Sequence, residues 1–174
     1  MKENKSKTTL SYVYAAAGVI LLTLFDQYTK AMAVLHLKDQ SAFVIWKGVF
    51  QLNYLENRGA AFGIMQNQQM FFAIVAAIIL IILIILYNKM PHTKKFWLLR
   101  FCSVLLCAGA IGNMIDRIKL NYVIDFFDFN LINFPIFNVA DCYVVVACIL
   151  FAISILFYYT DDELKCFSLK KGKK

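Results

Sequence analysis

The sequence predicts a mainly α-helical integral membrane protein with four transmembrane helices. Of its 174 residues, 61% are hydrophobic and only two are prolines. The apolar residues gather in four runs, each close to the roughly 20 residues that a helix needs to cross a bilayer core. Lysines and arginines cluster between these runs. No repeat, low-complexity segment or separate soluble region is visible, so we expect residues 1–174 to form a single domain.

The predicted spans cover residues 11–35, 70–87, 96–115 and 137–159. The first follows a basic segment, but its small residues come at the start of the run, so we expect an uncleaved span and not a signal peptide. The second is the clearest, because residues 73–86 carry no polar side chain. Between these two spans, residues 43–54 partly alternate apolar and polar side chains. This pattern favours a short strand or hairpin at the membrane surface, where Trp46 and Tyr54 suit the headgroup layer.

The distribution of positive charge predicts the orientation. With four spans, the two termini and the loop between the second and third spans lie on one side of the membrane. Twelve Lys and Arg residues lie on or next to that side, and six lie on the other. The positive-inside rule then places both termini and the loop 88–95 in the cytoplasm. Loops 36–69 and 116–136 become extracytoplasmic. Every unusual polar motif of the chain falls in those loops or at the outer end of a span.

Composition also excludes several classes of protein. The net charge of +7 arises from clusters that flank apolar runs, so we expect no nucleic-acid partner. The five cysteines show no C-x-x-C spacing, and the two histidines are isolated. We therefore predict neither a metal site nor a disulfide framework.

Two motifs lie near the outer side of the first two spans. Asp26 and Lys30 are four residues apart, so they share a helix face and can pair. An ionisable residue in a span is a functional candidate, although an ion pair that anchors the helix is the alternative, and we favour structural support over catalysis. Asn57 opens the segment 57–63, where Gly59 permits close backbone approach. A tight turn without a ligand would have the same sequence.

The third span ends in a polar stripe. Asn113, Asp116 and Arg117 have the i, i+3, i+4 spacing that places side chains on one helix face. Small residues at 108–110 and 112 permit tight packing against a neighbouring helix. The stripe is either a satisfied helix terminus or part of a site.

Two aspartates stand out at the outer boundary. Asp125 is a lone carboxylate among β-branched and aromatic residues in the 116–136 loop, where apolar surroundings raise a carboxyl pKa. Asp141 follows Asn138 by three residues at the start of the fourth span, as a helix cap would. Its position on the same membrane face as Asp125 suggests a second role. Two such carboxylates share a proton, and one acts as base on a water, as in aspartic proteases.

Taken together, these motifs resemble those of the lipoprotein signal peptidases, also called signal peptidase II, and they run in the family's order over nearly the whole chain. The matching stretches are 26–30, 57–63, 112–113 with 116–117, 123–126 and 137–141. The chain has Ala108-Gly109 where the family often has two adjacent glycines. The loop between the aspartates is also crowded by phenylalanines, namely Phe126, Phe127, Phe129 and Phe134.

The resemblance implies an aspartic endopeptidase of the bacterial cytoplasmic (inner) membrane, with a small extracytoplasmic β-sheet cradle and its active site on that side. It implies cleavage of prolipoprotein signal peptides just before a cysteine that carries diacylglycerol. The implied partners are these lipid-modified precursors and membrane lipids, with the chain acting as a monomer without cofactors. The implied residue roles are catalysis by Asp125 and Asp141, substrate binding by Asn57, Gly59, Asn113, Arg117 and Asn138, and structural support by Asp26, Lys30 and Asp116.

Our hypothesis from the residues is that a water held between the two aspartates attacks the scissile carbonyl. Asp141, in a first helical turn, is the candidate base, and Asp125 the candidate for holding the proton. Two other functions remain open at this point. A proton-coupled transporter subunit would use the aspartates as a relay. A noncatalytic assembly protein would use its polar ends to dock a partner.

Overall fold

Four long helices form most of the molecule. The computed structural model describes residues 2–59, 65–132 and 134–168. Within these ranges, four helices are long and apolar enough to cross a membrane, which confirms the predicted spans. Their bounds are α1, Lys2–Leu37; α2, Gln69–Lys89; α3, Trp97–Leu120; and α4, Val139–Phe157. A short helix α5, Asp161–Leu164, and 3₁₀ turns at Lys94–Phe96, Asn130–Ile132 and Lys165–Phe167 complete the helical elements.

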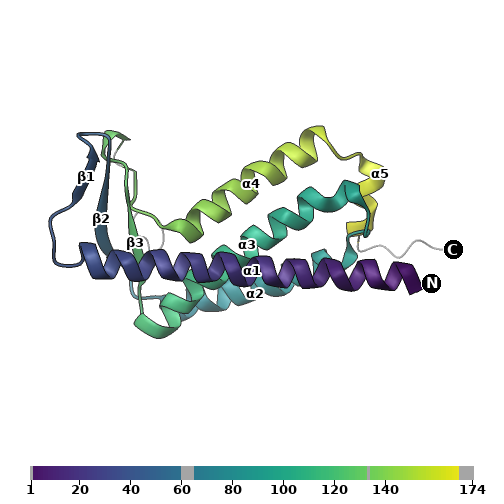
Figure 1. Cartoon of the computed structure of the whole chain (residues 1–174), viewed down its shortest axis with the longest axis horizontal. Helices are drawn as coiled ribbons and strands as arrows, with labels where there is room; N and C mark the ends of the chain where they lie inside the picture. Colours follow the sequence, from purple (N-terminus) through teal and green to yellow (C-terminus); the bar gives the residue numbers. More distant parts are fainter. Residues whose placement is uncertain (1, 60–64, 133, 169–174) are drawn as a thin grey trace.

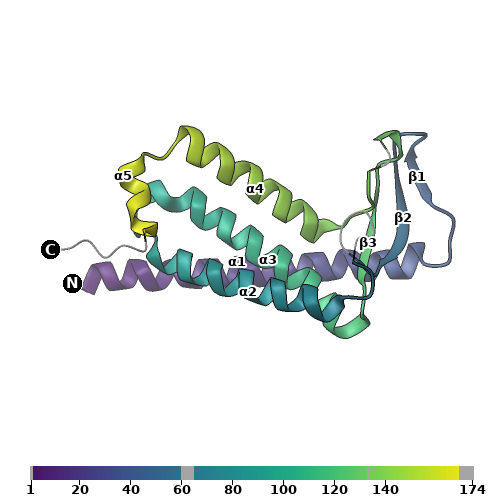
Figure 2. The same ribbon diagram turned by 180° about the vertical axis from the view of Figure 1, so that it is seen from behind.

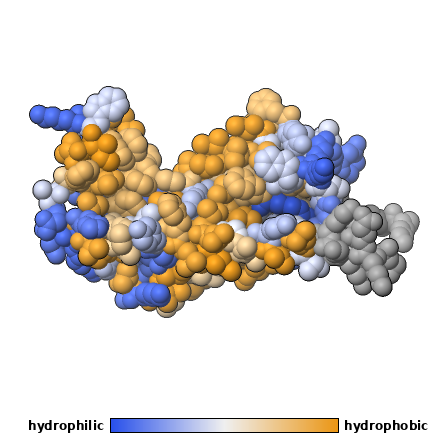
Figure 3. Space-filling view, in the orientation of Figure 1, coloured by the Kyte–Doolittle hydropathy of each residue, from blue (hydrophilic) through white to orange (hydrophobic). Residues whose placement is uncertain are grey.

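The helices lie lengthwise beside one another, with a small sheet across one end of the bundle (Figure 1). The start of α1 and helix α5 lie at the opposite end, as the view from behind also shows (Figure 2). Helix α3 is central, because it packs against α1, α2 and α4, and more of it is buried than of the others. The remaining helices present apolar side chains outward along the bundle (Figure 3). Such a surface suits a hydrocarbon solvent.

The sheet has three antiparallel strands in the order β1-β2-β3. Their bounds are β1, Phe43–Trp46; β2, Phe50–Asn57; and β3, Val123–Asp128. The predicted hairpin in 43–54 is confirmed, and it continues to Asn57. Its turn contains Gly48, whose φ of +76° lies in the region that favours glycine. Strand β3, which follows the third helix, pairs with β2 and places Asp125 opposite Leu55.

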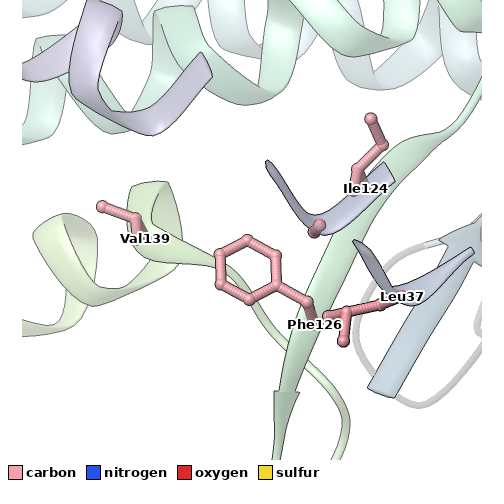
Figure 4. Close-up of a cluster of buried hydrophobic side chains, with 5 residues drawn as sticks. Leu37, Ile124, Phe126 and Val139 are labelled. Carbon is pink, nitrogen blue, oxygen red and sulfur yellow. The ribbon is translucent and has the colours of Figure 1, made fainter. Parts of the chain in front are cut away.

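A buried cluster holds the sheet against the helices. Ile124 and Phe126 of β3 pack with Leu37 of α1 and Val139 of α4 (Figure 4). Successive side chains on a strand point to opposite faces. The residue between Ile124 and Phe126 is Asp125, so burying its two neighbours turns the carboxylate to the other face of the sheet.

The structure corrects the prediction that residues 116–136 form a loop. Helix α3 continues to Leu120, five residues beyond the predicted end, and closes at Asn121, which is left-handed with φ 63°. The run Val123–Asp128 then forms a strand, so Asp125 lies on β3 and not in a loop turn. The physical reason is that a run of β-branched and aromatic residues fits a strand when a partner strand is available.

Helices α3 and α4 approach each other closely at a glycine. A Cβ added to Gly109 would lie 2.6 Å from the Ala140 carbonyl oxygen and 2.8 Å from Val144 Cγ2. A Cβ at Gly112 would lie 2.5 Å from Asp26 Oδ2. The small residues predicted to permit tight packing therefore do so, and they bring the first turn of α4 against α3.

We expect Gly109→Ala to lower the melting temperature. Alanine favours a helix over glycine by about 1 kcal/mol, but overpacking against a backbone carbonyl costs roughly 1–3 kcal/mol. Gly18→Ala is the matched control, because its Cβ would meet only the Val104 side chain, at 3.1 Å. Thermal unfolding of both variants in detergent is the measurement. A Gly109→Ala protein as stable as Gly18→Ala would contradict the close approach.

Candidate active site

Helix α4 begins with a capping box that uses one of the candidate aspartates. The Asn138 side chain accepts a hydrogen bond from the backbone N–H of Asp141 at 3.1 Å. Asp141 Oδ2 in return accepts one from the backbone N–H of Asn138, also at 3.1 Å. These bonds satisfy two donors that a helix start otherwise leaves unpaired. The capping role considered for Asp141 is therefore real, and it leaves Oδ1 for other partners.

Asn138 also connects the start of α4 to Asp125. Its Nδ2 donates to Asp125 Oδ1 at 2.7 Å and to Asn113 Oδ1 at 3.0 Å. Asn57, at the end of β2, donates from Nδ2 to the other Asp125 oxygen at 2.8 Å. Asn138 is fully buried and Asp125 is 2% exposed. Both oxygens of the Asp125 carboxyl thus accept a hydrogen bond from a side-chain amide.

The orientation of Asn113 is fixed by its neighbours. Its Oδ1 accepts from Lys30 Nζ at 2.8 Å as well as from Asn138. Since an amide oxygen only accepts hydrogen bonds, the amide nitrogen must face the other way. There it donates to Asp141 Oδ1 at 2.8 Å. A directed path of hydrogen bonds therefore runs from the Lys30 ammonium through Asn113 to Asp141.

Three buried charges lie beneath this network. Lys30 Nζ is 3.0 Å from Asp26 Oδ2 and 2.9 Å from Asp116 Oδ2, and none of the three residues is more than 2% exposed. Asp26 also accepts the backbone N–H of Ala140 at 2.9 Å, and Asp116 accepts that of Ile124 at 3.2 Å. Asp141 directly follows Ala140, and Asp125 directly follows Ile124. The buried charges therefore hold the backbone next to each candidate catalytic aspartate.

Gln27 is a member of this cluster to which the sequence assigned no role. Its Nε2 donates to Asp116 Oδ1 at 2.9 Å, and it lies 3.2 Å from both Asp26 Oδ2 and the Gly112 carbonyl oxygen. The available signal was a polar side chain next to Asp26 within a membrane span, where it requires a partner.

A cavity of about 660 Å³ lies where the polar residues meet. Its polar lining consists of Asn57, Gly59, Asn113, Arg117, Asp125 and Asp141, and the remaining lining is largely apolar. Figure 3 shows the surface hollowed between the sheet and α4. The lining includes Val145 and Val146, which are exposed on the outward side of α4. The cavity therefore opens toward the surface that would face lipid.

Arg117 brings a positive charge to the cavity. Its Nη1 donates to the Asn113 carbonyl oxygen at 3.4 Å, and its guanidinium lies 5.2 Å from the centre of the Phe72 ring. Among the described residues, its buried Nε has no hydrogen-bond partner. Arg117 thus places a guanidinium on the lining of a cavity that also holds two carboxyl groups.

The electrostatics distinguish Asp125 as the candidate proton carrier. Burial, followed by the charge of Asp141, raises the pKa of the Asp125 carboxyl to about 7. The hydrogen bonds from Asn57 and Asn138 act in the opposite direction but are the smaller effects. A pKa near neutrality lets this carboxyl exist in both protonation states under physiological conditions.

The residues singled out from the sequence come together as two layers. The cavity layer contains both aspartates with Asn57, Gly59, Asn113 and Arg117, joined by the buried Asn138. The supporting layer contains Asp26, Lys30 and Asp116. Gly59 contributes its backbone N–H, which donates to Asn57 Oδ1 at 3.0 Å. Residues 60–63 of the same motif lie outside the described residues.

Fold and site together define a multi-pass membrane protein with paired carboxyl groups at one end of its helical bundle. Residues 18–157 match the model of the signal peptidase (SPase) II family. The chain belongs to this family, whose members are proteases.

Individual relatives agree with the family match. The chain is 41% identical over 141 residues to a lipoprotein signal peptidase of Clostridioides difficile, which covers 80% of this chain and 93% of the relative. It is 39% identical, with the same two coverages, to a lipoprotein signal peptidase of Caldanaerobacter subterraneus. A bacterial membrane enzyme solved by the in meso method at 2.3 Å resolution aligns with a TM-score of 0.72 and 32% identity. That alignment covers 92% of this chain and 93% of the solved one.

The buried charges generate a prediction on stability. Lys30→Met leaves two buried carboxylates without a cation, so we expect a loss of about 3–5 kcal/mol in unfolding free energy. Lys38→Met is the matched control, because the Lys38–Glu56 pair is partly exposed and such pairs contribute less than about 1 kcal/mol. Denaturant unfolding in detergent compares the two. Equal losses of unfolding free energy would show that the buried cluster stabilises the fold no more than the exposed pair does.

Proposed function

We propose that the chain is a membrane aspartic endopeptidase that removes signal peptides from bacterial prolipoproteins, cutting just before the diacylglyceryl-modified cysteine. It acts as a single-domain monomer of residues 1–174. The observation that carries the proposal is the pair Asp125 and Asp141 on one cavity, in a chain that belongs to the signal peptidase II family. The lipoprotein signal peptidases of Clostridioides difficile and Caldanaerobacter subterraneus are similar over most of their length.

In the proposed mechanism, a water between the two carboxyl groups is the nucleophile. Asp141, as the anion, removes a proton from the water while the oxygen attacks the scissile carbonyl carbon. The protonated Asp125 gives its proton to the carbonyl oxygen as negative charge develops on that oxygen. When the tetrahedral intermediate collapses, the C–N bond breaks and the proton held by Asp141 passes to the leaving amine. Asp125 then recovers its proton from the intermediate's hydroxyl.

The polar groups around the two aspartates have separate proposed roles. Lys30 orients Asn113, which donates to Asp141 and favours its charged state. Arg117 lines the cavity, and we assign its guanidinium to a substrate carbonyl. Asn57, at the end of β2, and the nearby Gly59 are assigned to the substrate backbone. Asn138 positions both aspartates, because it donates to the Asp125 carboxyl and accepts from the Asp141 backbone N–H.

The lateral opening supports a lipid-modified substrate. The cavity reaches the exposed Val145 and Val146 of α4, so acyl chains can stay in the bilayer while the peptide bond meets the aspartates. The position of the pair at one end of the bundle also favours a peptidase over a transporter, since transporters place such groups near the midplane.

The direct experiment uses the purified chain with a diacylglyceryl-modified prolipoprotein in detergent. We expect a shortened product from the wild type and none from Asp125→Asn or Asp141→Asn, because neither variant keeps a carboxyl pair. Asp128→Asn is the control: it lies on the same strand, but its hydrogen bonds are to Gln51 and Asn53. Product formation is followed by gel mobility and mass spectrometry.

Wild-type turnover in either dyad variant would end the dyad proposal. No product from the wild type without a partner would favour the transporter or assembly function. Equal cleavage of modified and unmodified precursor would reject the lipid selectivity alone.

The raised pKa of Asp125 generates a prediction on pH dependence. The group must be protonated to donate, so activity is expected to be present below pH 7. It should fall as pH rises through about 7, approaching a tenfold loss per pH unit. The measurement is kcat/KM against pH between 5 and 9 for the wild type and Asp128→Asn, with the same profile expected for both, because kcat/KM reports the pKa values of the free enzyme. A kcat/KM that stays constant up to pH 9 would exclude Asp125 as the proton donor.

We further propose that both termini are cytoplasmic and that the cavity is extracytoplasmic. Support comes from the lysines from the end of α2 to the start of α3, namely Lys89, Lys94 and Lys95, of which Lys95 pairs with Glu163 of α5. Alkaline phosphatase, which needs disulfides, is expected to be active when inserted in the hairpin turn at Gly48 and inactive at the C-terminus. The reverse pattern of activity would invert the topology.

A further inference from the structure

A second cavity lies at the other end of the bundle, away from the sheet. It has a volume of about 510 Å³ and runs between α1 and α3, beside the turn that joins α2 to α3. None of its lining residues belongs to the candidate active site. Its polar end and its apolar body differ sharply in character.

The polar end is built around Arg100. This side chain is 9% exposed and donates to the Met90 carbonyl oxygen at 2.6 Å and to Ser11 Oγ at 3.3 Å. Its guanidinium also lies 4.6 Å from the centre of the Tyr87 ring. Lys94 lines the same end.

Among the residues whose side chains are described, no carboxylate balances these charges. The lining contains no Asp or Glu, and Arg100 makes no ion pair among the residues whose side chains are described. The nearby Lys95 is different, because it pairs with Glu163 at 2.6 Å. Burial and the charge of Arg100 lower the pKa of His92, another lining residue, which agrees with a positive local field. The polar end therefore complements an anion.

The body of the groove is apolar and elongated. Its lining on α1 extends from Leu10 to Leu22, a length of about 18 Å at 1.5 Å per residue. Phe101 and Val104 form the α3 side. Tyr14 and Trp97, both largely exposed, flank the polar end, as aromatic residues do at a headgroup layer. An anionic head with a long apolar tail fits both halves of this groove.

We propose that this groove binds one anionic phospholipid, with its phosphate at Arg100 and Lys94 and one acyl chain along α1 and α3. Phospholipid is the occupant because the groove lies on helices that span a membrane, where lipid is the solvent. The uncompensated positive charge selects an anionic headgroup over a zwitterionic one. The lipid joins the ends of α1 and α3, which also hold Lys30 and Asn113 at their far ends.

The test titrates the purified full-length chain with phosphatidylglycerol or phosphatidylcholine of identical acyl chains, with bound lipid counted by native mass spectrometry. We expect the first phosphatidylglycerol to bind more tightly than phosphatidylcholine, by about five-fold for each cation involved. Lys94→Gln should lose about five-fold of this preference. Ala15→Phe, which fills the groove without changing charge, should abolish the single tight site.

Each variant has a matched control that lies outside the groove. Lys89→Gln removes a charge at the same end, and Ala16→Phe adds the same ring on the exposed side of α1, so both should bind like the wild type. Glycerol phosphate, which lacks acyl chains, should not compete at equal concentration.

Four results would overturn the proposal. The first is loss of binding in Ala16→Phe equal to that in Ala15→Phe, and the second is an unchanged lipid preference in Lys94→Gln. The third is a wild-type dimer that Ala15→Phe dissociates, since it would make a second copy of the chain the occupant. Competition by glycerol phosphate would show a free-phosphate site instead of a lipid site.

Discussion

The structure depends on one lysine held between two carboxylates inside a membrane bundle. Removing such charges from water costs several kcal/mol per ion, so they persist only where geometry and hydrogen bonds compensate. Lys30 meets Asp26 and Asp116 at about 3 Å, and the same carboxylates accept the backbone N–H groups of Ala140 and Ile124. The charge cluster thereby joins α1, α3, α4 and β3 at one point. It adds to the backbone bridge between Phe127 of β3 and Phe137, just before α4, in aligning the start of α4 with the strand.

That alignment gives two chemically identical side chains different environments. Asp141 closes a capping box and receives Asn113, whose amide is oriented by Lys30. Asp125 lies on a strand between apolar neighbours, and burial with the nearby charge raises its pKa to about 7. Asn138 bonds to both. A network of three amides and one lysine thus separates a candidate base from a candidate proton carrier.

The sequence predicts the four spans, because lipid demands long apolar helices, and the hairpin, because its side chains alternate. The division of the polar residues into a site and its support was implied by the family resemblance. The sequence prediction fails where partners are distant in sequence. Asp125 was expected in a loop, because the local sequence does not show that residues 123–128 pair with β2. For Asp141 the sequence predicted a helix cap with a second role, but not that Oδ2 would close the capping box while Oδ1 accepts from Asn113. The role of Gln27 depends on Asp116, a contact across 89 positions.

The central claim is that the two aspartates hold different protonation states, and the most direct measurement is the titration of each carboxyl. The chain, labelled with ¹³C at aspartate carboxyl carbons, is titrated in detergent micelles by NMR, with Asp125→Asn and Asp141→Asn assigning the two signals. The account predicts that Asp125 remains protonated at pH 6 and titrates at about 7. Two carboxyls that both titrate near the ordinary aspartate pKa of about 4 would contradict it.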